Sequence, residues 1–199
     1  METSLRIATP WEGAPVYLKE RTGSTMDDAL ALARAGSPAG TTVVAGLQER
    51  GRGRAPGRLW VSGAWESLLA TVILRRVDAP PPSEMPLRAG LAASLAIEEA
   101  AGITVAIKRP NDILWEGRKL AGVLCESRGD ILLVGIGVNC RQLAFPPEIA
   151  QSACSLRQAC GRDISPLALL PLVLARLKAS LEDGLWRGKV DERLVTRDR

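Results

Sequence analysis

Two short basic segments carry residue types that bind anionic groups. The first is a Gly-Arg-Gly-Arg run at residues 51–54, followed by Trp60, and the second is the Lys-Arg-Pro-Asn-Asp run at residues 108–112. Glycines let backbone N–H groups approach an anion closely, and guanidinium groups match the geometry of carboxylates and phosphates. Trp60 offers a face for stacking on an aromatic base. Taken alone, a short Gly/Arg stretch is as often a solvated basic loop as a binding site. A second alternative is RNA binding of the Arg-Gly type, which usually needs repeated units and more aromatic residues than the 4% in this chain.

Other polar and glycine-containing segments have both structural and functional interpretations. Ser24 and Thr25 offer hydroxyls that cap a helix or contact a ligand. The Pro-Asn-Asp sequence after Lys108 is an ordinary turn signal. Gly122 within a strand indicates close approach by a ligand or by another backbone. The Gly-x-Gly sequence at residues 135–137 is not a dinucleotide fingerprint, because no helix follows it.

The composition restricts the available chemistry. The chain contains no histidine, which excludes Ser-His-Asp and Cys-His catalysis and most zinc sites. Its four cysteines form no Cys-x-x-Cys pair and are expected to be reduced, buried side chains. The net charge of +4 suggests an anionic partner without identifying it. Chemistry must therefore rely on lysines, arginines, carboxylates, hydroxyls and backbone groups.

The length and hydropathy pattern predict one domain over residues 1–199 with no membrane contact. No apolar run approaches the length of about 18 residues that a membrane helix needs. The N-terminus lacks the basic and apolar regions of a signal peptide. We therefore expect the protein in the cytoplasm.

The elements that must position these residues alternate between helices and strands. Turn signals at Glu116-Gly117 and at residues 128–130 predict two hairpins. This pattern predicts an α+β fold with a mixed, mostly antiparallel sheet flanked by helices. The expected strands are 16–19, 41–48, 67–75, 104–108, 113–115, 119–127 and 131–138, and the expected helices are 24–36, 86–101 and 166–183, before a charged tail.

The order of these motifs resembles the catalytic domain of biotin protein ligases. The resemblance runs from about residue 16 to residue 139, and the GRGR and KRPND segments are its most specific parts. It implies a fold related to class II aminoacyl-tRNA synthetases and a reaction in two steps. Biotin and ATP first form biotinyl-5′-AMP, with Mg²⁺ as cofactor and metal-binding residues unassigned. A lysine of a biotin carboxyl carrier domain then attacks this acyl-adenylate.

The resemblance also implies roles for individual residues. The expected catalytic residues are Lys108, Arg52 and Arg54. Contacts to biotin are expected from Ser24, Thr25, Gln48, Gly51, Arg52, Gly53, Arg54, Lys108 and Gly122, and contacts to ATP from Arg54, Trp60, Lys108, Asn111, Lys119 and Asn139. The basic residues suit the first step, because two like charges 4 Å apart repel by about 4 kcal/mol at an effective dielectric constant near 20.

Several departures from the family pattern bear on these expectations. Met26 stands where an asparagine is usual, Arg109 replaces a common tryptophan, and the Gly/Arg loop has an extra residue near Ala55-Pro56, which shifts Arg58. The short segment before Val16 predicts no DNA-binding winged helix, and the small C-terminal β-domain is expected to be absent.

The sequence leaves other questions open. These include the acceptor's identity and whether two copies form a homodimer. Two alternatives stand beside the biotin ligase: a ligase of the same superfamily that acts on lipoate or another acyl group, and a degenerate binder of biotin or nucleic acid.

Overall fold

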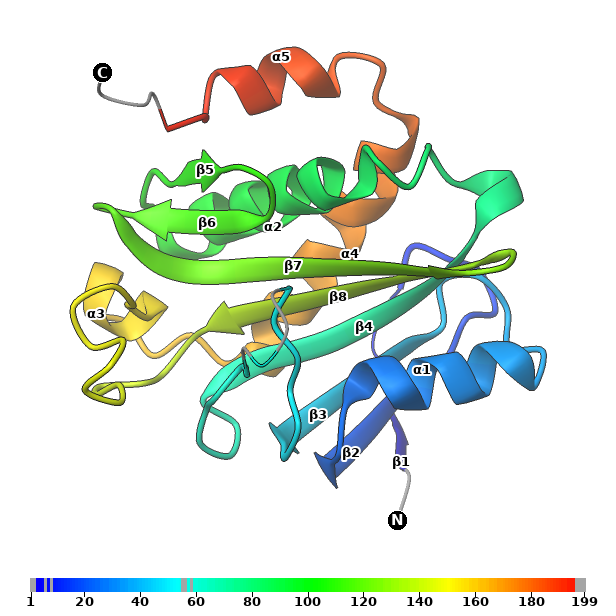
Figure 1. Cartoon of the computed structure of the whole chain (residues 1–199), viewed down its shortest axis with the longest axis horizontal. Helices are drawn as coiled ribbons and strands as arrows, with labels where there is room; N and C mark the ends of the chain where they lie inside the picture. Colours follow the sequence, from blue (N-terminus) through cyan, green and yellow to red (C-terminus); the bar gives the residue numbers. More distant parts are fainter. Residues whose placement is uncertain (1–2, 6, 8, 55–56, 58, 196–199) are drawn as a thin grey trace.

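An eight-stranded sheet forms the centre of the computed structural model, which describes residues 3–5, 7, 9–54, 57 and 59–195 (Figure 1). The strand order is β1-β2-β3-β4-β8-β7-β6-β5. The β2–β3 pair is parallel, whereas the other pairs of these strands are antiparallel. The strands are Thr3–Leu5 (β1), Val16–Thr22 (β2), Thr42–Gln48 (β3), Ser67–Arg75 (β4), Ala106–Lys108 (β5), Asp112–Trp115 (β6), Arg118–Arg128 (β7) and Ile131–Asn139 (β8). The expected mixed, mostly antiparallel sheet is confirmed.

Helices cover the two faces of the sheet unequally. The α-helices are Thr25–Arg34 (α1), Met85–Ala101 (α2), Leu156–Cys160 (α3), Pro166–Glu182 (α4) and Trp186–Asp191 (α5), and Arg76–Asp78 forms a short 3-10 turn. Helices α2 and α4 lie together on one face, whereas α1 lies on the opposite face over β3, β4 and β8 (Figure 1). None of the helices in the described ranges is long and apolar enough to span a bilayer.

The alternation of side chains along the strands separates two cores. In β8, Leu132 and Val134 face the large core under α2 and α4, whereas Ile131 and Leu133 face the smaller core under α1. This follows from the two-residue period of a strand. Because α1 spans only ten residues, it covers only part of the sheet face on which it lies. The helix leaves the remaining part of that face uncovered. Several of the expected site residues, among them Thr25, Gln48 and Gly122, line a pocket on this face.

The two predicted hairpin turns are confirmed and have identifiable backbone causes. Glu116 and Gly117 have φ values of 46° and 76° and connect β6 to β7. Two consecutive positive φ values are the signature of a tight turn whose twist matches the strands that flank it. Gly129, with φ of 66°, serves the β7–β8 connection. These turns place β6, β7 and β8 side by side, which brings the KRPND segment and the Gly-x-Gly sequence at residues 135–137 to one sheet.

The structure corrects the expected charged tail. The chain forms α5 there, and Trp186 and Val190 are buried against Leu91 and Ile107. Residues 193–195 then run parallel to β5, where the N–H of Ile107 donates to the carbonyl of Arg193 at 2.7 Å. The apolar positions were visible in the sequence, but a six-residue helix is too short for a clear helical period. Strand β1 and helix α3 escaped prediction for the same reason.

Candidate active site

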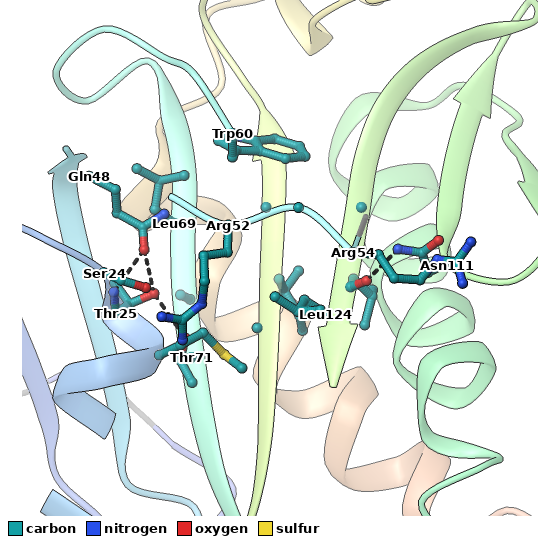
Figure 2. Close-up of a pocket in the computed structure, with 18 of the residues that line it drawn as sticks. Ser24, Thr25, Gln48, Arg52, Arg54, Trp60, Leu69, Thr71, Asn111 and Leu124 are labelled. Atoms are coloured by element: carbon teal, nitrogen blue, oxygen red, sulfur yellow. Dashed lines mark hydrogen bonds between the residues drawn. The ribbon is translucent and has the colours of Figure 1, made fainter. Parts of the chain in front are cut away.

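A pocket opens on the α1 face, where β7 and β8 carry glycines in register. Gly122 of β7 pairs with Gly137 of β8, and Leu124 of β7 pairs with Gly135. Because these glycines have no side chain to point toward α1, they leave a hollow between α1 and residues 52–54 (Figure 2). We call this hollow the first pocket. Leu69 and Thr71 of β4 and Leu124 form its walls.

The Trp60 side chain lies directly over the glycine row. A Cβ atom on Gly137 would lie 2.9–3.1 Å from the Trp60 ring, and one on Gly122 would lie 3.3 Å from it. A Cβ on Gly122 would also lie 3.1 Å from Lys119 Cε. Gly122 thus leaves room for Trp60 and Lys119, and because it also lines the first pocket its expected contact with biotin stays a prediction.

A fixed hydrogen-bond network forms the polar end of the first pocket. Gln48 Oε1 accepts hydrogen bonds from the backbone N–H of Thr25 at 2.7 Å and from Thr25 Oγ1 at 2.9 Å. Thr25 Oγ1 also lies 2.8 Å from Thr71 Oγ1. The network holds the Gln48 amide in one orientation. The contribution of Thr71 was not expected from the sequence, because a threonine within a strand gives no distinguishing signal.

Ser24 presents an unpaired hydroxyl to the same pocket. It precedes the first residue of α1, yet its side chain makes no capping hydrogen bond. The residue is only 2% exposed, and its Oγ atom has no hydrogen-bond partner among the residues that the structure describes. A buried hydroxyl without a partner costs about 1–3 kcal/mol, so a ligand that bonds to it would recover this cost. Side-chain capping therefore does not explain Ser24, and its expected contact with biotin stays a prediction.

Three cationic side chains line the first pocket: Arg52, Arg54 and Lys119. Arg52 Nη1 lies 2.7 Å from Asp27 Oδ1, and Lys119 Nζ lies 2.7 Å from Asp112 Oδ1. Lys119 Nζ is also 5.7 Å from the centroid of the Trp60 ring. Arg54 extends toward Asn111 on the far side of the pocket from Gln48 (Figure 2).

A second pocket adjoins the first and shares Gly53, Arg54, Trp60, Asn111 and Lys119 with it. It extends toward the end of β5 and toward the segment after β8. Its remaining lining residues are Leu59, Val61, Lys108, Arg109, Pro110, Asp112, Asn139, Phe145, Ile149, Ser152 and Ala153.

The two expected lysines occupy different places. Lys108 is exposed at the end of β5, opposite Asp112 in the register, and lines only the second pocket. It shares that pocket with Arg54 but does not join Arg52 and Ser24 in the first pocket. Lys119 lines both pockets. The expected contact of Lys108 with biotin stays a prediction, and Lys119 occupies the junction between the two pockets.

Both asparagines expected on the nucleotide side have structural partners. Asn111 Nδ2 donates to the carbonyl of Val123 at 2.7 Å, which ties the turn after β5 to β7. Asn139 Nδ2 donates to the carbonyl of Cys154 at 2.9 Å, and only 5% of Asn139 is exposed. These bonds fix the segments that frame the second pocket. Both residues still line that pocket, so a contact to a ligand stays a prediction.

The departures from the family pattern also have positions in the structure. Met26 lines the first pocket and is buried, and its Sδ atom would lie 3.0 Å from a Cβ on Gly135. Arg109 Nη2 lies 3.5 Å from Asp191 Oδ1 of α5, a partner that the sequence did not reveal. Ala55, Pro56 and Arg58 lie outside the described residues, so the shift of the last loop arginine stays a prediction.

The cysteines take no part in either pocket. All four are free thiols, as expected from their spacing. Burial raises the pKa of Cys125 and of Cys140 from 9.0 to about 12 and that of Cys154 to about 11, so they are poor nucleophiles near neutral pH. Within the described ranges, no group of three or more cysteine and acidic side chains is arranged to hold a metal ion.

Comparison with known sequences supports the resemblance inferred from the motifs. Residues 18–142 match the Biotin/lipoate A/B protein ligase family. The bifunctional ligase/repressor BirA of Bacillus subtilis is 37% identical over 200 residues, which covers 94% of this chain and 60% of BirA. The biotin–[acetyl-CoA-carboxylase] ligase of Mycobacterium tuberculosis is 37% identical over 144 residues, or 68% of this chain and 52% of that protein. The chain thus spans little more than half the length of these relatives.

Solved structures show the same fold. The biotin protein ligase from Aquifex aeolicus in complex with biotin and ATP matches with a TM-score of 0.79 and 30% identity, covering 90% of this chain and 78% of that one. The biotin protein ligase from Leishmania major in complex with biotinyl-5-AMP matches with a TM-score of 0.79 and 26% identity, covering 90% and 81%.

Proposed function

Because the chain belongs to the Biotin/lipoate A/B protein ligase family, we propose that it forms biotinyl-5′-AMP from biotin and ATP and transfers biotin to a lysine of a biotin carboxyl carrier domain. The observation that carries this proposal is the first pocket. It combines an unpaired buried hydroxyl, a fixed amide and three cations around an apolar hollow. Biotin has the matching parts, namely a polar ureido group, an apolar bicyclic body and a carboxylate tail.

The polar end of the first pocket suits the ureido group. Ser24 Oγ is free to bond, and the Gln48 amide is held through its oxygen, which leaves its NH₂ group as a donor. Thr25 then acts mainly by orienting Gln48. The apolar walls, including Leu69, Leu124 and Met26, suit the bicyclic ring. The proposed contacts of Gly51 and Gly53 are backbone contacts, because neither residue has a side chain.

The second pocket suits the nucleotide. It continues from the first through Trp60, Arg54 and Lys119, so the carboxylate of a molecule in the first pocket faces a phosphate in the second. Trp60 offers a face for the adenine ring, because aromatic rings prefer stacked or edge-to-face neighbours. Asn111, Asn139 and Lys108 line the same pocket and are the proposed neighbours of ATP.

The first reaction step joins two anions, and the cations at the junction lower its cost. The carboxylate oxygen attacks the α-phosphorus, and pyrophosphate leaves with the electron pair of the broken P–O bond. Positive groups already in place stabilise the charge that builds on the phosphoryl oxygens. We assign this role to Lys119, with Arg52 and Arg54 beside it, because Lys119 lines both pockets. Lys108 lines the second pocket, and we place its main role on the nucleotide side.

Magnesium would enter with ATP. Proteins commonly bind Mg²⁺ through one or two carboxylates together with the phosphates of the substrate, so a three-residue cage is not needed. Asp112 is a carboxylate that lines the second pocket, although it pairs with Lys119 in this structure. It is therefore the proposed protein ligand. When bound, the ion neutralises phosphate charge and orients the leaving pyrophosphate.

The acceptor and the acyl group are tested together in one experiment. Purified protein, ATP and Mg²⁺ are incubated with a biotin carboxyl carrier domain and either biotin or lipoate, and the carrier domain is weighed by mass spectrometry. The proposal expects the mass to increase by one biotinyl group and expects no change with lipoate. Modification by lipoate alone would favour the alternative acyl ligase, and no modification by either would contradict the transfer step.

A further inference from the structure

Arg52 is held by carboxylates from both sides of the first pocket. Its Nη1 atom lies 2.7 Å from Asp27 Oδ1 in the first turn of α1, and its Nε atom lies 3.6 Å from Glu126 Oε1 on β7. In Figure 2 the Arg52 side chain extends from the Gly/Arg segment into the space between Thr25 and Leu124. One guanidinium therefore connects α1 to β7 across the pocket before any ligand is present.

The two carboxylates are not equivalent. Glu126 also pairs with Arg128 Nη2 at 3.0 Å, so its charge is shared between two guanidiniums. Asp27 makes the shorter contact to Arg52, which is both an ion pair and a hydrogen bond. Charge-assisted hydrogen bonds of this length are among the stronger side-chain interactions. Asp27 therefore does more to fix the position of Arg52.

The backbone on either side of Arg52 is also restrained. The N–H of Trp60 donates to the carbonyl of Gly51 at 2.8 Å, and Arg52 forms an isolated bridge with Leu59. The main chain at Arg52 is thus anchored near Trp60, whereas its long side chain depends on Asp27 and Glu126. A flexible side chain that is already fixed loses less conformational entropy when a ligand binds.

We propose that Asp27 is a positioning residue that keeps Arg52 across the first pocket and thereby slows the release of bound biotin. This inference rests on the proposed function. Asp27 itself does not line the pocket and acts only through Arg52. The interaction that stabilises bound biotin is then the Asp27–Arg52 pair, and its loss increases the dissociation rate of biotin.

Asp28 provides a matched control in the same helical turn. Its carboxylate pairs with Lys19 Nζ at 3.0 Å and accepts a hydrogen bond from Thr22 Oγ1 at 2.6 Å, and neither partner lines the pocket. Asp27→Asn and Asp28→Asn remove the same charge from the same end of α1. Any effect of charge on the helix dipole or on the overall field is therefore common to both variants.

The test measures the release of labelled biotin from the full chain after addition of excess unlabelled biotin. We expect Asp27→Asn to release biotin about two- to fivefold faster than Asp28→Asn, because the loss of one partly exposed ion pair has an effect of about this size. Asp27→Glu should restore part of the slow release. In an Arg52→Ala background, Asp27→Asn should have no further effect, because the two residues act as one pair.

The outcomes separate this inference from the proposed function. Equal release rates for Asp27→Asn and Asp28→Asn, or an undiminished effect of Asp27→Asn without Arg52, would overturn the inference alone. A wild-type protein that shows no saturable binding of biotin would overturn the proposed function and this inference with it. Thermal unfolding of each variant identifies any change in release that comes from a loss of folded protein.

Discussion

The Ser24 hydroxyl shows how a single buried group can favour binding at the cost of stability. A protein group that gains a hydrogen bond when a ligand binds must lack that bond in the empty protein, and Ser24 Oγ is buried with no hydrogen-bond partner in the described part of the chain. Thr25 is its neighbour but plays a different part, because its hydroxyl is already bonded to Gln48 and Thr71. The two neighbouring hydroxyls therefore have different roles: that of Ser24 is available to a ligand, and that of Thr25 supports Gln48.

Replacing Ser24 should therefore move affinity and stability in different directions. In Ser24→Ala we expect the affinity for biotin to fall about three- to tenfold, because one neutral hydrogen bond contributes about 0.5–1.5 kcal/mol. The empty protein should unfold at the same temperature or higher, because an unpaired buried hydroxyl is removed. Calorimetry gives the affinity and thermal unfolding gives the stability. A lower unfolding temperature in the absence of biotin would contradict this account of Ser24.

A second prediction at the residue scale compares the roles of Lys119 and Lys108. We expect Lys119→Ala to slow biotinyl-5′-AMP formation in a single turnover by about 10²–10³-fold, as when a key electrostatic group is removed. Lys108→Ala should slow adenylate formation less, and its main effect should be an increase in the ATP concentration that the reaction needs. Rapid-quench measurement of the adenylate in both variants provides the comparison. If Lys108→Ala slowed adenylate formation more than Lys119→Ala did, the main electrostatic role would belong to Lys108 instead of Lys119.

At the scale of elements, the sequence predicted where the strands lie better than it predicted how they pair and what covers them. The strands that carry the KRPND segment, Gly122 and the Gly-x-Gly sequence at residues 135–137 follow from apolar runs between turn residues, and both hairpin turns follow from glycines. The sequence did not reveal that Gly122 and Gly137 pair in register or that Trp60 covers both, because strand register and loop return depend on contacts distant along the chain. Helix α5 was missed because six residues hold too little periodicity.

The glycine row makes a prediction for one substitution. In Gly137→Ala the new Cβ would lie 2.9–3.1 Å from the Trp60 ring, so the ring must move. We expect weaker binding of ATP with the fold retained, because the clash affects one side chain on the open face. Binding of ATP and thermal unfolding are compared with Gly90→Ala, whose added Cβ meets nothing within 4 Å. Unchanged binding of ATP in Gly137→Ala would show that the position of Trp60 is unimportant.

At the scale of the whole molecule, two desolvated thiols, that of the buried Cys140 and that of the half-buried Cys125, link the stability of the fold to alkaline pH. The raised pKa values of Cys125 and Cys140, about 12 against 9.0, arise from desolvation of the thiolate. Above pH 9 the unfolded chain loses these protons while the folded protein keeps them. Stability from this source is therefore complete below pH 9 and is lost as the pH rises toward 12.

This linkage predicts a measurable fall in stability. Between pH 9 and pH 11 each thiol should lower the free energy of unfolding by about 1 kcal/mol per pH unit. Urea unfolding across this range is compared between the wild type and a Cys125→Ala, Cys140→Ala double variant, in which other titrating groups are unchanged. The variant should show a shallower dependence on pH. Identical slopes would indicate that the thiols ionise equally in both states.

We propose that the cations between the two pockets let a biotin carboxylate react with ATP. The most direct measurement is the exchange of labelled pyrophosphate into ATP, which requires only the first reaction step and no acceptor protein. We predict exchange that depends on biotin and Mg²⁺, does not occur with lipoate, and is largely lost in Lys119→Ala. Absence of biotin-dependent exchange in a folded protein, or full exchange in Lys119→Ala, would contradict the account.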